Sequence, residues 1–269
     1  MSQARKTGQY KRLVIKVGTS TITYPNGRLN LRMMEKLAWE LTDFHNRGLD
    51  VALVSSGAVG VGSVRLGFAE RPTVTRQKQA AAAVGQAALM QIYQNFFNTY
   101  HQTVAQILLT KEDFFEGERR QNTINTMNTL FEMGVIPIIN ANDVTSTSEI
   151  EGLVFSDNDQ LSATVAGAIS ADLLVLLTDI DALYDKDPRS YPDAKRVPFV
   201  SEITPEIMAM AGAKGSTFSV GGMDTKLKAA AQCLAAGVDM VIAESTDPTI
   251  VNQILDGKDV GTLFSREAR

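Results

Sequence analysis

The sequence is poor in residues that form cross-links or bind metals: its 269 residues include one cysteine and two histidines. The single cysteine, Cys233, cannot form an internal disulfide, which suits a reducing cytoplasm, where we expect the protein to be. His45 and His101 are widely separated and form no zinc-binding pattern with it. Cys233 stands among alanines and leucines in a helical pattern, so we expect it to pack in the core and not to act as a nucleophile.

Long apolar runs are also missing. The purest ones, Val135–Ile139 and Leu173–Leu177, fall far short of the roughly twenty residues that a membrane span requires. The polar segment 1–11 carries Arg5, Lys6 and Lys11 without an apolar core after them, so it is not expected to be a signal peptide. A net charge of −4 argues against nucleic acid or an anionic membrane as the main partner. We therefore expect neither a nucleic-acid-binding nor a membrane protein.

Strand and helix patterns alternate along the chain, which is 44% hydrophobic and 21% charged, the balance of an ordinary globular protein. Apolar runs predict strands at 11–17, 51–54, 104–109, 135–139, 173–177 and 238–243. Periodicity and capping residues predict helices at 31–47, 75–100, 119–133, 158–169 and 225–236, with short helices after Thr204 and Asp247. Asp224 is the expected cap of the helix that ends at Ala236. The strands are continuously apolar, which indicates an α/β fold with a mainly parallel sheet covered on both faces.

One stretch of the chain, from Gln79 to Thr110, contains no charged residue, and Tyr93, Phe96, Phe97 and Tyr100 gather in it. A buried central helix or an oligomer interface would each explain this pattern.

Ligands of parallel sheets bind beyond the carboxyl ends of the strands, so the loops there are the places to search. After the first strand, Lys16 and Gly18 with the hydroxyls that follow could hold phosphate oxygens, although a surface lysine beside an ordinary turn is the alternative. After the second strand we expect a loop from Ser55 to Gly62. Its glycines follow the order G-x-x-G-x-G, which is not the dinucleotide fingerprint, and helix packing could equally explain them.

Amides and carboxylates follow the strand at 135–139, in Asn140–Asp143 and again in Asp157–Gln160. Such groups suit an ammonium, a hydroxyl or a hydrated cation, while capping of the next helix by Asp157 or Asn158 is the structural alternative. The Asp157-x-Asp159 pattern is not an EF-hand, since Ser162 and Ala168 occupy the positions of its glycine and glutamate.

Two more polar segments complete the set: Thr178-Asp179 after the strand at 173–177, and 221–226 at a helix start. Lys226 in a first helical turn is electrostatically unfavourable without an anion, which favours a functional role. Neither the Walker motif nor the protein-kinase motifs occur.

Six ordered motifs, KVGTST, LVSSGAVG, IINAND, SDNDQLSA, LLTDIDALYDKDPR and GGMDTKLKAA, resemble the amino-acid kinase family over about Lys11 to Phe264. The resemblance is strongest to members that phosphorylate the side-chain carboxylate of L-glutamate with ATP in the first step of proline biosynthesis. It implies a single domain, 1–269, with a three-layer α/β/α sandwich and a mainly parallel sheet. An amino-acid-binding lobe at 1–170 and a nucleotide-binding lobe at 171–269 are expected, and the chain ends too soon for the RNA-modification-type domain of many members.

The resemblance also implies roles for residues of the motifs. Lys16, Asp159 and Lys226 are expected to be catalytic, with the aspartate holding both lysines. The expected glutamate-binding residues are Ser56, Gly57, Asp143 and Asn158. The expected nucleotide-binding residues are Lys16, Gly18, Thr178, Asp179, Val220, Gly221, Gly222, Met223, Asp224, Thr225 and Lys226. No protein side chain is expected to bind the metal. The chain departs from the family at Ala141, Phe155-Ser156 and Ser219-Val220, where substrate affinity and feedback inhibition could differ.

The implied chemistry is a phosphotransfer to a carboxyl group, with ATP and Mg²⁺ as donor and cofactor, proline as a possible feedback inhibitor and a homo-oligomer as the expected assembly. A carboxylate with a pKa near 4.3 is already an ionised nucleophile at neutral pH, so positive charge and positioning matter more than a base. Free glutamate also has an ammonium that Asp143 could pair with, whereas N-acetylglutamate has none. Kinases of N-acetylglutamate, aspartate, carbamate or UMP, and a non-catalytic sensing module, are the alternatives.

Overall fold

The computed structural model describes residues 10–145, 157–211 and 222–266. The chain divides into two compact units, which we call the inner unit (Val17–Asn158) and the terminal unit (Met1–Lys16 with Asp159–Arg269). This division differs from the expected lobes 1–170 and 171–269. The reason is that the first strand, β1 (Arg12–Val17), lies in the sheet next to β5 (Leu173–Thr178), which brings the start of the chain into the terminal unit.

The inner unit alternates strands and helices. Its elements are α1 (Thr19–Ile22), α2 (Leu31–Asn46), β2 (Asp50–Ser55), α3 (Ala58–Arg65), α4 (Thr75–Thr99), β3 (Val104–Leu109), the 3₁₀ helix η1 (Lys111–Phe114), α5 (Glu118–Glu132) and β4 (Ile136–Ala141). The strands follow the order β3-β4-β2, and both pairs are parallel. In the β2–β4 pair Val54 lies opposite Ile139, so Ser55 and Asn140 come next at the same edge.

Local signals account for the start and the buried face of α2. The side chain of Asn30 accepts a hydrogen bond from the backbone N–H of Met33, as expected of an N-cap. Met34, Leu37 and Leu41 repeat at helical spacing and are buried. The helix predicted at this position is therefore confirmed, and the positive φ of Gly48 follows its end.

The terminal unit holds the remaining elements. Besides β1 and β5 they are α6 (Asn158–Ala168), β6 (Leu183–Tyr184), β7 (Arg196–Val197), β8 (Phe199–Val200), α7 (Pro205–Ala209), α8 (Met223–Ala236), β9 (Asp239–Glu244), α9 (Ile250–Leu255) and β10 (Thr262–Phe264). The strand order is β1-β5-β9-β10-β8, with β6 and β7 paired separately. The β5–β9 pair is parallel and the β9–β10 pair antiparallel, so the mainly parallel sheet predicted from the sequence is confirmed.

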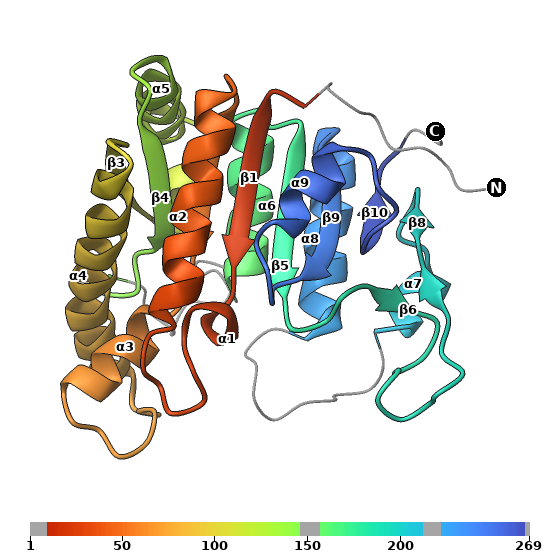
Figure 1. The fold of residues 1–269 in the computed structure, drawn as a ribbon, viewed down its shortest axis with the longest axis horizontal. Coiled ribbons are helices and arrows are strands. Elements are labelled where there is room, and N and C mark those ends of the chain that lie inside the picture. The colour runs from red at the N-terminus through yellow and green to blue at the C-terminus, as the bar shows by residue number, and fades with distance from the viewer. Residues whose placement is uncertain (1–9, 146–156, 212–221, 267–269) are drawn as a thin grey trace. The chain divides into compact units, whose positions relative to one another are not determined.

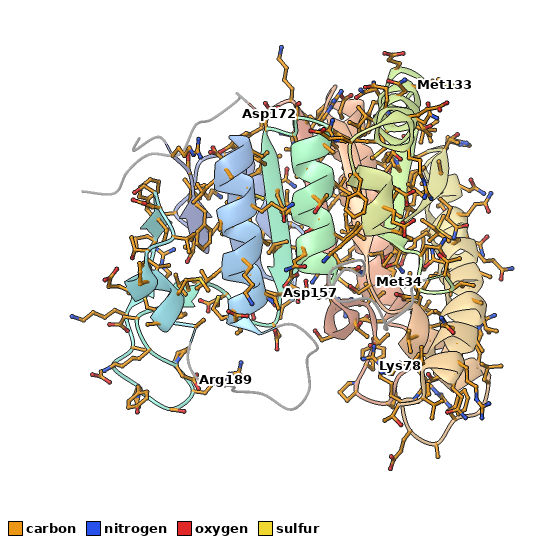
Figure 2. All side chains as sticks on the ribbon, turned by 180° about the vertical axis from the view of Figure 1, so that it is seen from behind. Met34, Lys78, Met133, Asp157, Asp172 and Arg189 are labelled. Carbon is orange, nitrogen blue, oxygen red and sulfur yellow. The ribbon has the colours of Figure 1, made fainter. Side chains whose placement is uncertain are left out.

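Helices cover both faces of the strands in the terminal unit. In Figure 1, α9 lies in front of the strands, and in Figure 2, which is seen from behind, α6 and α8 lie on the near side with β5 visible between them. Every residue of β5 is buried, as its continuous apolar run predicted. Cys233 of α8 is also buried, and burial raises the pKa of its thiol to about 12, which confirms its role in the core.

The uncharged stretch forms most of α4 and β3. Tyr93 and Phe97 are fully buried, whereas Val84 on another face of α4 is 36% exposed. Burial therefore explains only one side of this helix, and an oligomer interface on the other side stays a prediction. No helix in the described ranges is both long enough and apolar enough to cross a membrane.

Helix α3 is the main element that the sequence did not predict. Of the glycines in the expected loop from Ser55 to Gly62, only Gly57, with φ +102°, lies outside a helix. Gly60 and Gly62 lie inside α3, so the predicted loop is wrong beyond Gly57. A Cβ on Gly62 would lie 1.8 Å from the carbonyl oxygen of Ala81 in α4, and one on Gly85 of α4 would lie 1.8 Å from that of Ala58. Helix packing, and not anion binding, therefore accounts for Gly62.

We predict that Gly62→Ala lowers the free energy of unfolding by about 3 kcal/mol, because the added methyl group forces α3 and α4 apart. Gly60→Ala in the same helix is the control, since its Cβ would meet only Thr19 Cγ2, at 3.7 Å. That variant should be neutral or gain up to about 1 kcal/mol from helix propensity. Urea unfolding measures the free energy of unfolding of both variants. Equal values for the two variants would contradict the packing argument.

Candidate active site

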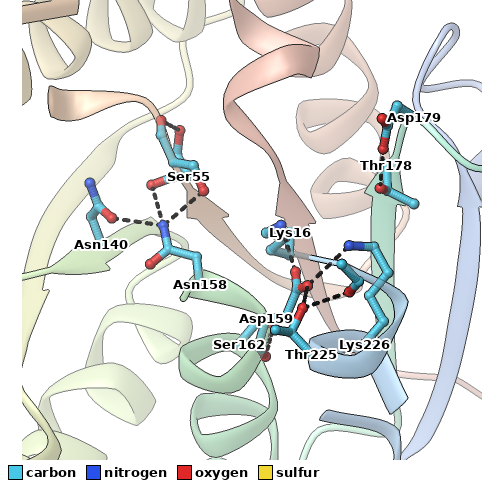
Figure 3. Close-up of polar contacts among 12 residues, drawn as sticks. Lys16, Ser55, Asn140, Asn158, Asp159, Ser162, Thr178, Asp179, Thr225 and Lys226 are labelled. Atoms are coloured by element: carbon cyan, nitrogen blue, oxygen red, sulfur yellow. Dashed lines mark hydrogen bonds and ion pairs between the residues drawn. The ribbon is translucent and has the colours of Figure 1, made fainter. Parts of the chain in front are cut away.

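Asp159 is the centre of a buried ionic cluster in the terminal unit. Lys16 Nζ lies 2.6 Å from its Oδ1, and Lys226 Nζ lies 3.2 Å from its Oδ2 (Figure 3). The three residues come from β1, the first turn of α6 and the first turn of α8. Their exposed fractions are 8% for Lys16, 1% for Asp159 and 3% for Lys226. The structure thus brings together the three residues expected to be catalytic.

The cluster pairs one carboxylate with two ammonium groups. Burial pushes the pKa of Asp159 upwards, but the charges and hydrogen bonds of Lys16 and Lys226 outweigh burial and lower the pKa to about 2. The carboxylate is therefore ionised at neutral pH, and it has two ammonium groups beside it. Because ammonium groups attract anions, this arrangement suits an anionic ligand.

A hydroxyl group at the start of α8 also contacts the carboxylate of Asp159. Thr225 Oγ1 lies 3.0 Å from Asp159 Oδ2 and 2.8 Å from the carbonyl oxygen of Gly222, so its one proton has two acceptors. The N-cap is Gly222, so the prediction that Asp224 caps this helix is wrong. Asp224 stands in the first turn and pairs with Lys228 at 2.7 Å. In the described part of the chain, the cap residue makes no side-chain hydrogen bond at the start of α8, and the first N–H groups of a helix suit a phosphate.

Thr178 and Asp179 lie at the carboxyl end of β5. Thr178 is 6% exposed, and its Oγ1 donates a hydrogen bond to Asp179 Oδ1 at 3.0 Å (Figure 3). Its carbonyl oxygen accepts from the backbone N–H of Ser245, just beyond β9. The side chain of Asp179 is thereby held at the strand end, where the sequence placed a nucleotide contact. That contact stays a prediction.

A second polar cluster, which we call the amide cluster, lies in the inner unit around Asn158. Asn158 Nδ2 donates to Ser56 Oγ and Asn140 Oδ1, both at 2.9 Å, and to the carbonyl oxygen of Ser55 at 3.3 Å (Figure 3). Ser55 and Asn140 are buried, whereas Ser56 and Asn158 are half-buried. The cluster brings together Ser56 and Asn158, both expected to bind the amino acid. Its partner Asn140 stands in the polar segment that the sequence analysis singled out, but the family resemblance implied no role for it.

Asp143 lies in the turn after β4 and is half-buried. Burial raises its pKa, and the charge of Arg71 opposes this rise. Within the described residues no hydrogen bond joins Asp143 to Asn158, so the structure gives no direct link from Asp143 to the amide cluster. Ala141, one of the departures from the family pattern, donates its backbone N–H to Asn140 Oδ1 at 2.9 Å.

The glycines of the expected site have local structural reasons. Gly18 is the N-cap of the short helix α1, and Gly57 is the N-cap of α3. A Cβ on Gly57 would lie 2.9 Å from Ile22 Cδ1, and its positive φ already disfavours other residues. The described residues do not include two expected site residues, Val220 and Gly221. They also do not include the departures from the family pattern at Phe155-Ser156 and Ser219-Val220.

Two supporting residues of the amide cluster escaped the sequence analysis. Gln86 and Tyr93 of α4 contact Asn140 and Ser55, which stand at the ends of β4 and β2. Their spacing of seven residues places them on one helix face, and this was the only available signal. In the described ranges, no three side chains of His, Cys, Asp or Glu come together in a way that could hold a metal ion.

Comparison with known proteins identifies the family of this chain. The model of the amino acid kinase family matches residues 11–244. The "Glutamate 5-kinase" of Clostridium perfringens is 51% identical over 256 residues, which cover 94% of this chain and 95% of that protein. The protein of the same name from Thermoanaerobacter sp. (strain X514) is 47% identical over 253 residues, which cover 94% of this chain and 67% of the relative.

A solved structure, that of UMP kinase from Bacillus anthracis, is similar with a TM-score of 0.66 and 16% identity. The similarity covers 96% of this chain and 97% of the other, and at this identity it concerns the fold alone. It supports the α/β fold described above. Because the family model matches most of its length and close relatives are about half identical, the chain belongs to the amino acid kinase family.

Proposed function

We propose that the chain transfers the γ-phosphoryl group of ATP to the side-chain carboxylate of L-glutamate, giving L-glutamyl 5-phosphate in the first step of proline biosynthesis. The observation that carries this proposal is the buried cluster in which Asp159 holds Lys16 and Lys226. The relatives named Glutamate 5-kinase, about half identical over nearly the whole chain, support glutamate as the substrate.

The cluster fits a reaction between two anions. The attacking carboxylate is ionised at neutral pH and needs no general base. The barrier comes from bringing it to a triphosphate, so the enzyme must supply positive charge and an in-line arrangement. Lys16 and Lys226 stabilise the charge on the transferring phosphoryl group, and Asp159 keeps both ammonium groups in place.

The nucleotide is held by residues at the ends of β5 and the start of α8. Thr178 and Asp179 contact the nucleoside part, while the first N–H groups of α8 and the segment 220–226 contact the phosphates. ATP enters as its magnesium complex, so Mg²⁺ is part of the substrate and neutralises phosphate charge. Gly18 contributes a backbone N–H beside Lys16.

The amino acid is held by Ser56, Gly57, Asp143 and Asn158. Asn158 and Asp159 are consecutive residues at the start of α6, so one peptide bond joins the amide that holds glutamate to the carboxylate that holds the lysines. Asp143 pairs with the ammonium of free glutamate, which favours glutamate over N-acetylglutamate. Feedback inhibition by proline and assembly into a homo-oligomer remain predictions of the family resemblance.

The acceptor is tested with ATP, Mg²⁺ and hydroxylamine, with one acid at a time. Hydroxylamine traps an acyl phosphate as its hydroxamate, and we expect this product from L-glutamate. N-acetylglutamate and aspartate should give at least tenfold less, because neither places an ammonium and the reacting carboxylate at the same separation. Preference for another acid would replace glutamate in the proposal, and no hydroxamate from any acid would favour a UMP kinase or a sensing module.

Lys226→Ala should lower kcat by roughly 10²–10³, the scale for the loss of one donor to the transition state. Lys228→Ala is a matched control, because Lys228 lies on the same helix with a side chain that is 53% exposed. Steady-state kinetics of both variants, with circular dichroism to verify folding, measure the difference. Near-normal turnover of the Lys226 variant would remove this lysine from the mechanism.

Asp143→Asn should raise KM for glutamate about 10- to 100-fold with a smaller change in kcat, since its contact with the ammonium is present before and during transfer. The substitution keeps the size of the side chain and removes its charge. KM for ATP serves as the internal control and should stay within about twofold. An unchanged KM for glutamate would show that Asp143 does not bind the amino acid.

A further inference from the structure

Helix α4 contacts the ends of β2 and β4 through two buried polar side chains. Asn140 Nδ2 donates a hydrogen bond to Gln86 Oε1 at 2.9 Å. Two helical turns further on, the hydroxyl of Tyr93 lies 2.8 Å from Ser55 Oγ. Gln86 is 9% exposed and Tyr93 is fully buried, and each bonds to a residue at a strand end.

A backbone N–H fixes the direction of the Asn140 amide. Ala141 N donates to Asn140 Oδ1 at 2.9 Å, and a backbone N–H can only donate, which identifies the oxygen end of this amide. The NH₂ end of Asn140 therefore faces Gln86, whose Oε1 must be the acceptor. The same Oδ1 also accepts from Asn158 Nδ2.

The direction of the Asn158 amide follows from that of Asn140. Asn140 Oδ1 and the carbonyl oxygen of Ser55 are acceptors only, and Asn158 Nδ2 donates to both. The nitrogen of Asn158 is thus directed into the protein. Among the described residues, none donates a hydrogen bond to Asn158 Oδ1, so the half-buried side chain presents an acceptor oxygen as its available end.

We propose that Gln86 is a positioning residue for the amino-acid substrate. The backbone N–H of Ala141 sets the direction of the Asn140 amide, and Gln86, by accepting from its NH₂ end, holds that amide in place. Through Asn140 it keeps Asn158 oriented as an acceptor for a cationic donor group. This inference rests on the proposed function, in which that group is the ammonium of glutamate. Gln86 acts through Asn140 and Asn158, so its effect depends on whether the ligand carries an ammonium.

The test compares Gln86→Met with Gln86→Glu. Methionine matches glutamine in length and has no acceptor oxygen, so KM for glutamate should rise about tenfold while KM for ATP stays within about twofold. Glutamate at this position keeps an oxygen at the same reach and should restore most of the loss. Gln91→Met, at an exposed position of the same helix, is the matched control and should leave both KM values unchanged.

Glutarate, which is glutamate without its ammonium, separates positioning from general damage. Its inhibition constant should be the same for the wild-type and Gln86→Met enzymes, because the oxygen of Asn158 has no donor to bind in this ligand. Equal losses for glutamate and glutarate, or an unchanged KM for glutamate in Gln86→Met, would overturn the proposal. If the methionine variant does not fold, Gln86→Asn withdraws the oxygen by one methylene without burying an apolar group, and the same results are expected.

These outcomes are distinct from a failure of the proposed function. A wild-type enzyme that forms no hydroxamate from glutamate overturns both the function and the positioning role. An active wild-type enzyme with a fully normal Gln86→Met variant overturns only the positioning role.

Discussion

The carboxylate of Asp159, held between two ammonium groups, is the interaction on which the rest of the structure depends. Each partner needs the others: a buried carboxylate alone would take up a proton, and two buried lysines alone would repel each other. Together they keep the pKa of Asp159 at about 2 and place two ammonium groups beside one carboxylate. The elements that carry these residues, β1, α6 and α8, are far apart in the chain, so the cluster forms only when the sheet of the terminal unit brings them to one end.

The start of α6 joins this charge cluster to the amide cluster, for which we propose a role in amino-acid binding. Successive residues of a helix diverge by about 100°, so Asn158 and Asp159 extend from one turn in different directions. Asn158 binds to the strand ends of the inner unit, and Asp159 binds to the lysines of the terminal unit. Because the two residues are adjacent, a displacement of this turn would move both side chains together. This constraint explains why two unlike polar residues follow one another here.

The sequence predicted the long elements well because their signals are local. Asn30 caps α2 with its own side chain, and the apolar run of β5 marks a buried strand without reference to the rest of the chain. Helix α3 escaped prediction because Gly60 and Gly62 resemble a loop, and the reason for Gly62 lies in α4. The same holds for the site: the family resemblance identified Asp159 and its lysines, whereas no local pattern pairs Gln86 with Asn140.

In the function that we propose, the two clusters solve different physical problems with different groups. A transferring phosphoryl group carries negative charge on several oxygen atoms. Ammonium groups suit it because they attract anions from any side. An amino acid must be held in one orientation, and neutral amides do this because each has a donor end and an acceptor end. In the amide cluster the direction originates at the backbone N–H of Ala141 and passes through Asn140 to Asn158. Because this donor is a backbone group, a side chain other than alanine at position 141 preserves the direction, and only the residues that relay it are constrained in type.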